Sequence, residues 1–248
     1  MNNWDVMPVL LLLLFSTALS IGMGIVILVI RRAQRQEFSS KPNQQSPPLS
    51  PAERSFYFRR PSCWLAIKSR NLSSVQSAFG LHNPKPCSWL EGLSAEPKLF
   101  IAPPVKGWVL VLGSGLPDPS DDVDACFRFV LELSRKLGHV QLFCANRVLH
   151  HHAWVRAQRG KVVRAYAWAG RTLWQQGKLT SAEKDLSLKC FDYAAPSEPV
   201  SFDQEDVISS NLEKIPLLAA RWSLDPAHIE ARFFEADRGI AGEPSWRF

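Results

Sequence analysis

An uncharged apolar stretch near the start of the chain constrains its organisation more than any other feature. Residues 8–30 contain no Asp, Glu, Lys or Arg, and they include the apolar runs 10–14 and 25–30. As a helix, this stretch is about 34 Å long, which exceeds the roughly 30 Å hydrocarbon core of a bilayer. A cleaved signal peptide has a basic leader and a shorter apolar stretch. The sequence therefore predicts a short tail over residues 1–7 and a transmembrane helix over residues 8–30, with the lipid bilayer as its partner.

The charges beside this span predict its orientation. Arg31, Arg32 and Arg35 follow the span immediately, whereas Asp5 is the one charged residue before it. Because basic flanks are retained in the cytoplasm, we expect a single-pass protein with its N-terminus outside and its C-terminal domain in the cytoplasm. The same three arginines are positioned to contact anionic lipid headgroups.

Composition divides the rest of the chain into a linker, a domain and a tail. Residues 31–62 are basic and rich in Pro, Ser and Gln, with too few aliphatic side chains to form a core, which predicts a flexible linker. We expect a soluble domain over residues 63–240 and a C-terminal tail over residues 241–248. Residues 61–248 hold 22 basic and 20 acidic side chains, and this near balance argues against nucleic acid as a partner.

The cysteines do not suggest a secreted protein. They are widely spaced and odd in number, unlike the framework of a small disulfide-rich domain. We expect reduced and mostly buried thiols. The five positions are Cys63, Cys87, Cys126, Cys144 and Cys190.

Hydrophobic periodicity and capping residues predict an α+β domain with a largely antiparallel sheet packed with helices. Asn71 and Asp121 are suited to cap helices, and Thr180 with Glu183 forms a capping box. Pro84 and Pro86 indicate a loop. The expected strands cover residues 64–67, 98–102, 107–112 and 139–144. The expected helices cover residues 72–79, 122–137, 180–188 and 213–222, and a last one begins at residues 225–226.

The strongest hairpin signal runs over residues 150–169 and turns at Arg159 and Gly160. A two-residue turn places Val155 opposite Arg164 and Ala153 opposite Tyr166. This register sets large side chains on each strand against small ones on its neighbour. The sequence therefore predicts complementary packing on both faces of the sheet.

One constellation on this hairpin has the residue types of a site. On a strand, His150 and His152 project from one face and can share a metal ion, with Cys144 as the nearest third ligand. No HExxH or paired-cysteine motif completes such a centre. The same face, with Trp154 and Arg156, is also suited to the wall of a ligand pocket, or it is a partly buried sheet face. No cofactor is predicted.

Two further motifs lack the companions that their chemistry needs. Residues 113–115 read Gly-Ser-Gly between a strand and a helix, but no third glycine or Gly-Lys-Ser follows. The acids Asp121, Asp122 and Asp124 suit the positive start of the helix, with divalent-cation binding as the alternative. Residues 181–184 match Ser-x-x-Lys without the other motifs of acyl-serine enzymes.

Several stretches between Trp64 and Pro226 are distinctive, namely residues 84–89, 107–117, 121–127, 164–168 and 216–222. Through these stretches, the region from Trp64 to Pro226 is similar to a group of uncharacterised bacterial membrane-anchored proteins. This resemblance implies a bacterial inner membrane and no particular activity.

These patterns favour a single-pass membrane protein that presents a cytoplasmic α+β domain for binding or regulation, without catalysis of its own. The alternative is a membrane-tethered enzyme that uses the face of His150, His152, Trp154 and Arg156, with or without a metal. A reversed topology, with the domain outside the cytoplasm, is the third possibility.

Overall fold

The computed structural model describes residues 62–94, 98–193, 202–226, 229 and 238–246. The predicted membrane helix, the linker up to residue 61 and the lipid contact of Arg31, Arg32 and Arg35 lie outside these residues. So does most of the last predicted helix, which begins at residues 225–226. Within the described residues, no helix combines the length and the apolar character that crossing a bilayer requires.

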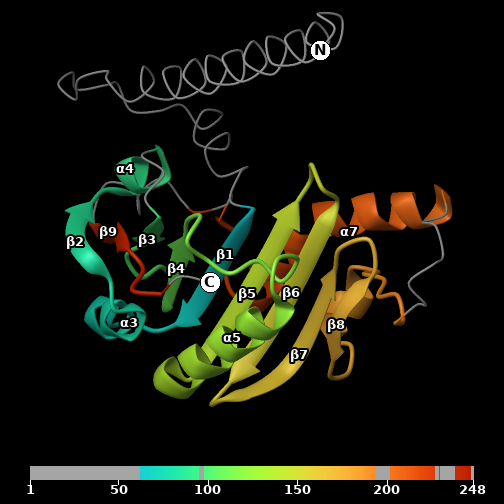
Figure 1. Ribbon diagram of the computed structural model, residues 1–248, viewed down its shortest axis with the longest axis horizontal. Helices are drawn as coiled ribbons and strands as arrows, with labels where there is room; N and C mark the ends of the chain where they lie inside the picture. Colours follow the sequence, from blue (N-terminus) through green and yellow to red (C-terminus); the bar gives the residue numbers. More distant parts are fainter. Residues whose placement is uncertain (1–61, 95–97, 194–201, 227–228, 230–237, 247–248) are drawn as a thin grey trace, which may run out of the picture. The chain divides into compact units, whose positions relative to one another are not determined.

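In the described part of the chain, nine strands form one sheet in which every pairing is antiparallel (Figure 1). Their order across the sheet is β2-β9-β3-β4-β1-β5-β6-β7-β8. The strands are β1 (Cys63–Lys68), β2 (His82–Cys87), β3 (Leu99–Ile101), β4 (Trp108–Leu112), β5 (His139–Asn146), β6 (His151–Gln158), β7 (Lys161–Trp168), β8 (Thr172–Gln176) and β9 (Gly239–Glu243).

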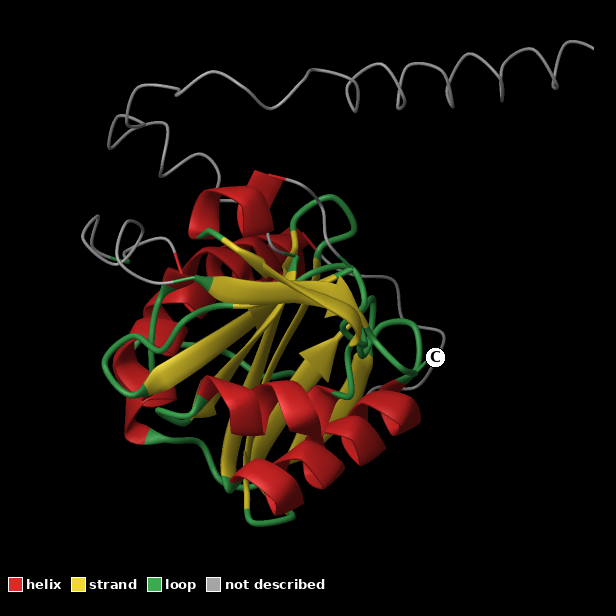
Figure 2. Ribbon diagram, turned by 90° about the vertical axis from the view of Figure 1, so that its left-hand side faces the viewer, coloured by secondary structure: helices red, strands yellow, loops and turns green. Residues whose placement is uncertain are grey.

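Helices cover both faces of this sheet (Figure 2). The helices are α3 (Leu72–Phe79), α4 (Trp89–Ser94), α5 (Val123–Leu137), α6 (Ser181–Asp185) and α7 (Phe202–Trp222). Residues of α3 and α5 pack on one face, which we call the α5 face, and residues of α7 pack on the other, which we call the α7 face. The domain is therefore α+β with a large antiparallel sheet, as the sequence predicts.

Strand β1 shows how the sequence produces a sheet that is buried on both sides. Leu65 and Ile67 contribute to the core under the α5 face, while Trp64 and Ala66 contribute to the core under the α7 face. Side chains alternate between the two faces of a strand, so a continuous apolar run is needed where both faces are covered.

The caps of the helices largely follow the sequence. Asn71 accepts a hydrogen bond from the Ser74 amide at the start of α3, and the predicted capping box opens α6. The cap of α5 is Asp122, one residue later than predicted, and it accepts a hydrogen bond from the Ala125 amide. An acceptor at this position satisfies one of the amide groups that a helix leaves without a partner.

The register of the β6–β7 hairpin differs from the prediction. The turn at Arg159 and Gly160 is correct, but a bulge between Arg156 and Ala157 shifts the pairing, so that Trp154 lies opposite Tyr166. The large side chains of the two strands therefore share the α7 face rather than alternating with small partners. The α5 face receives small side chains, Ala153, Val155, Ala157, Ala165 and Ala167.

The two prolines predicted in a loop belong to β2, which lies at one edge of the sheet. Proline has no amide hydrogen and is tolerated at an edge strand, where one side of the strand has no neighbour. The pairing partner of β2 is β9, which lies between β2 and β3. Residues 241–243, placed by the sequence in a tail, thus take part in the sheet, and Trp246, just after the strand, packs against Phe79 and Phe129.

Helix α7 begins at Phe202, well before the predicted start at residue 213. Ser209, Ser210 and Asn211 lower the helix propensity of its first half, which explains the late prediction. Burial of Ile208 and Leu212 in the core of the α7 face outweighs that local preference.

Candidate functional site

A disulfide joins two central strands at the end of the sheet where the described chain begins. Cys63 on β1 lies directly opposite Cys144 on β5, with 4.1 Å between their Cα atoms, and their sulfur atoms are bonded. The expectation that all five cysteines are reduced is therefore wrong for this pair, while Cys87, Cys126 and Cys190 are free. The two strands are far apart in sequence, so the spacing of the cysteines gave no sign of the pairing.

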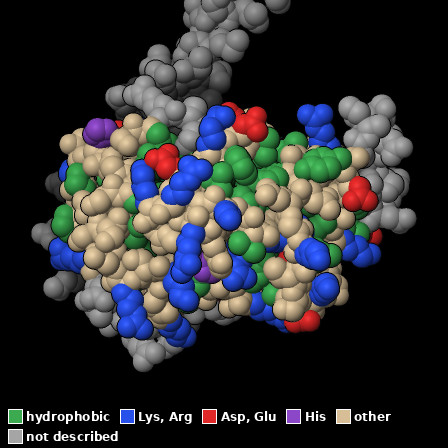
Figure 3. All heavy atoms as spheres, turned by 90° about the horizontal axis from the view of Figure 1, so that it is seen from below, with side chains coloured by type: hydrophobic (Ala, Val, Ile, Leu, Met, Phe, Trp, Pro, Cys, Tyr) green, Lys and Arg blue, Asp and Glu red, His purple; other side chains and the backbone are tan. Residues whose placement is uncertain are grey.

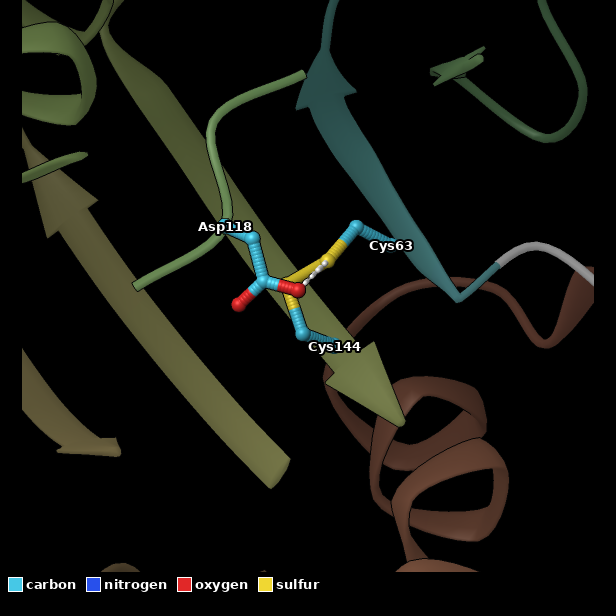
Figure 4. A group of neighbouring side chains, drawn as sticks. All are labelled: Cys63, Asp118 and Cys144. Atoms are coloured by element: carbon cyan, nitrogen blue, oxygen red, sulfur yellow. Dashed lines mark hydrogen bonds between the residues drawn. A yellow bond between two sulfur atoms is a disulfide. The ribbon is translucent and has the colours of Figure 1, made fainter. Parts of the chain in front are cut away.

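Asp118 lies beside this disulfide (Figure 4). Its Oδ2 atom is 3.7 Å from the Cys63 sulfur, and its Oδ1 atom accepts hydrogen bonds from the amide and hydroxyl of Ser120 at 2.9 and 2.8 Å. The Ser120 contacts hold the carboxylate in place, so Asp118 is a fixed neighbour of the bond.

The three side chains also have the donor types of a metal site. One ligand atom from each of Cys63, Asp118 and Cys144 lies within 4.8 Å of the other two. Two thiolates and a carboxylate are suitable ligands for zinc, but zinc needs the thiolate form of both cysteines. In the disulfide the sulfurs are bonded to each other, so a metal would compete with this bond.

Asp118 also lines a cavity of about 590 Å³. Its walls are the loop before α5 and the segment after β9, and both acidic and basic side chains line it. Besides His82, the charged residues on its wall are Lys98, Asp118, Asp121, Asp122 and Glu243. Asp118 therefore lies next to the Cys63 sulfur and also lines the cavity.

The Gly-Ser-Gly sequence before α5 serves packing in this loop. The Gly115 amide donates to the Lys98 carbonyl at 2.8 Å, and a Cβ atom on Gly115 would lie 2.9 Å from the same oxygen. The glycine is required because the loop passes this close to the backbone beside β3. Asp122 serves as the cap of α5, in line with the capping role that the sequence favours for this cluster.

The structure separates the two histidines that were candidates for a shared metal. His150 is exposed in the turn before β6, with φ of 56°, whereas His152 is buried on the strand. Cys144 lies opposite Ala153 in the core of the α5 face, and strand alternation directs His152 to the other face. The side chains of Cys144, His150 and His152 therefore do not converge on a shared metal position.

His152 instead lies in an aromatic stack under α7. Its ring is 5.8 Å from that of Trp154 and 5.6 Å from that of Trp168, and its Nε2 atom is 3.4 Å from the Asn211 amide nitrogen. Burial lowers the pKa of His152 to about 4, so the neutral ring is the form present near neutral pH. Whether this face binds a ligand stays a prediction.

Arg156, the last residue of the predicted face, is half-buried between Gln141 and Arg164 on the adjacent strands. Its positive charge also faces His139. Burial first, and then the charges of Arg156 and Lys68, lower the pKa of His139 to about 4. These groups form a positively charged end of the sheet.

A buried ion pair that no sequence pattern predicted joins α6 to the sheet. Arg164 Nε and Trp154 Nε1 both donate to Glu183 Oε1 at 2.7 Å, and Arg164 and Glu183 are essentially inaccessible to solvent. The capping box predicts that Glu183 Oε2 accepts hydrogen bonds at the start of α6, but it does not predict the partners of Oε1. The bulge in β7, which directs Arg164 to the α7 face, had no clear sequence signal.

Basic side chains gather at the end of the sheet away from the disulfide. By register, β1 ends at Lys68, β5 begins beside Arg159 and β7 begins at Lys161, all at this end. Figure 3 looks onto this end and shows a stripe of Lys and Arg side chains around a histidine. We define the basic end by the exposed residues Lys68, Arg135, Arg159 and Lys161 together with Arg156.

Comparison of the chain with protein-family models, with curated proteins and with solved structures finds no match.

Proposed function

We propose that the protein is a single-pass membrane protein whose tethered α+β domain is a binding or regulatory module for a protein with an acidic surface. The observation that carries this proposal is the basic end of the sheet. Lys68, Arg159 and Lys161 are exposed there, and among the described residues none of them has an ion-pair partner. Unpaired charges of one sign steer a partner of the opposite sign.

The position of this end relative to the linker supports the proposal. The linker leads into β1 at Cys63, and β1 runs from there to Lys68. At about 3.3 Å per residue, the six residues of β1 span roughly 20 Å. Within the domain, the basic end therefore lies at the opposite end of β1 from Cys63, where the linker leads into the strand.

The basic end is also rigid. The Arg159 amide donates to the Gly138 carbonyl at 2.7 Å, and the Gly160 amide donates to the Ser134 hydroxyl at 2.9 Å. These bonds fix the hairpin turn to the end of α5. A fixed arrangement of charges reduces the entropy lost when a partner binds.

Two observations favour binding over catalysis. Two of the four residues expected to form an enzymatic wall, His152 and Trp154, are 1% and 0% exposed, so they are part of the core under α7, whereas His150 is exposed and Arg156 is half-buried. In the part of the chain that the structure describes, no hydrogen bond joins a serine or cysteine to a histidine, which is the usual activation of a nucleophile. We propose the cytoplasm for the domain, on the basis of the arginines after the predicted span.

Cross-linking of the full-length protein in its own membrane tests this proposal. The test variant carries Lys68→Glu, Arg159→Glu and Lys161→Glu, and the control carries three reversals elsewhere on the surface, Lys178→Glu, Lys184→Glu and Lys189→Glu. We expect a cross-linked partner with the wild type and the control, a loss of at least tenfold with the test variant, and weaker capture as salt is raised.

Equal capture by both variants would overturn the binding role of the basic end. A reporter fused after Phe248 tests the orientation separately, and activity of a periplasmic reporter there would overturn the cytoplasmic placement. Recovery of the full-length protein in the soluble fraction would overturn the membrane anchor.

A further inference from the structure

The pair Cys63 and Cys144 has features that a purely structural crosslink does not need. A hydrogen-bonded carboxylate lies 3.7 Å from one sulfur, and that carboxylate also lines an open cavity. A disulfide sulfur carries no hydrogen and cannot donate to Asp118. A thiol at Cys63 can donate, so this contact becomes a hydrogen bond only when the disulfide is reduced.

We infer that Cys63 and Cys144 form a redox-active pair that exchanges with dithiols, and that Asp118 transfers the proton in this exchange. Asp118 is suited to this role because it reaches both the Cys63 sulfur and the cavity. Cys63 and Cys144 themselves are 7% and 3% exposed, so the carboxylate provides the contact between the sulfur and solvent protons.

The reaction balances with one dithiol as reductant. A thiol of the dithiol gives its proton to Asp118 Oδ2, and its sulfur attacks Cys144 Sγ. The bond between Cys63 and Cys144 breaks, its electron pair stays on Cys63 Sγ, and Asp118 transfers the proton to that sulfur. The second thiol of the dithiol then displaces Cys144, which receives the remaining proton. The protein disulfide gains two electrons and the dithiol becomes a disulfide.

The proposed cytoplasmic placement supports a redox-active role for this disulfide over a purely structural one. Disulfides in the cytoplasm are usually transient and serve catalysis or redox sensing, whereas permanent ones are typical of oxidising compartments. This part of the inference rests on the proposed function. The exchange chemistry itself is a property of the domain in either compartment, so it is tested on purified protein.

The test is the rate at which dithiothreitol reduces the full-length protein in detergent under native conditions. The chain has five cysteines, of which three are free, so alkylation after unfolding labels three thiols in the oxidised form and five in the reduced form. The test variant is Asp118→Asn, which keeps an oxygen for Ser120 but cannot carry the proton. The matched control is Asp121→Asn on the same cavity wall.

We expect the wild type and Asp121→Asn to be reduced at the same rate, and Asp118→Asn to be reduced about 10- to 100-fold more slowly. We also expect the equilibrium with dithiothreitol to shift about fivefold toward the disulfide in Asp118→Asn, because the thiol loses its acceptor. Equal rates in all three proteins would overturn the role of Asp118. Reduction of the wild type only at its rate of global unfolding would overturn the redox pair.

These outcomes are distinct from those that test the proposed function. A periplasmic result from the fusion after Phe248 would remove the cytoplasmic role while leaving the measured exchange rates valid. Trapping of thiols in intact cells joins the two tests, because a cytoplasmic pair that cycles yields both the three-thiol and the five-thiol forms, and their ratio changes after an oxidant is added.

Discussion

At the scale of single residues, His152 couples the stability of the domain to pH. The ring is buried between Trp154 and Trp168, and its Nδ1 atom is buried without a hydrogen-bond partner. An ordinary histidine has a pKa of 6.5, and burial lowers the pKa of His152 to about 4. The unfolded chain therefore binds a proton at a higher pH than the folded chain does, which favours unfolding as the pH falls from 6.5 toward 4.

We predict that His152→Phe makes the domain less sensitive to acid. Between pH 7 and pH 4.5 the wild type should lose about 2 to 3 kcal/mol more unfolding free energy than His152→Phe, because the variant has no ring to protonate when it unfolds. Urea unfolding followed by tryptophan fluorescence at both pH values measures the difference. The control is His82→Phe at an exposed position of β2, and an identical pH dependence in wild type and His152→Phe would contradict the prediction.

At the scale of elements, the short helix α6 is held to the sheet by an ion pair that water does not reach. Glu183 on α6 pairs with Arg164 on β7, and both side chains are buried. A second pair on the same helix, Asp185 with Arg221 of α7, has a distance of 3.3 Å and is largely exposed. Removing one partner of a buried pair leaves an uncompensated charge, whereas an exposed pair contributes little.

We predict that Glu183→Ala lowers the unfolding free energy by about 3 to 5 kcal/mol and Asp185→Ala by less than about 1 kcal/mol. The double variant Arg164→Met with Glu183→Leu should recover part of the loss, since it removes both charges. Chemical denaturation of the four proteins provides the comparison. Equal losses of unfolding free energy for the two single variants would show that burial does not determine how much an ion pair contributes to stability.

The elements also show what local sequence information is able to predict. Most expected helices and strands are present because each has its own signal, such as Asn71 before α3 or the turn at Arg159 and Gly160. The register of β6 and β7 depends on one bulge, and a shift of one residue exchanges the two faces of a strand. That single shift gathers the large side chains on the α7 face and brings Arg164 to Glu183.

Non-local pairing explains the other differences between expectation and structure. Strand β9 has two glycines and no extended apolar run, and its place between β2 and β3 comes from contacts with strands more than 130 residues earlier. The contact of Asp118 with Cys63 likewise joins residues 55 positions apart. Hydrophobic periodicity and turn residues report on neighbours along the chain, so they carry no signal for contacts of this kind.

At the scale of the whole molecule, the disulfide constrains the unfolded chain more than it changes the fold. It joins cysteines 81 positions apart, and closing a loop of this length removes entropy equivalent to about 4 kcal/mol from the unfolded ensemble. Single domains commonly have unfolding free energies of about 5 to 15 kcal/mol, so the reduced domain should remain folded. This margin is what a redox-active pair requires, because both forms must keep the sheet intact.

We predict that reduction of the disulfide lowers the unfolding free energy by about 4 kcal/mol, and that Cys63→Ala with Cys144→Ala has a comparable effect. Urea unfolding of the domain in the full-length protein, with and without dithiothreitol, measures the first change. Dithiothreitol should leave the unfolding free energy of the double variant unchanged, which excludes an effect through Cys87, Cys126 or Cys190. If the reduced wild type is already unfolded without urea, the domain lacks the unfolding free energy that a reversible redox cycle requires, and the prediction is wrong. A folded reduced form keeps β1 and β5 paired, so the two thiols are positioned to re-form the bond.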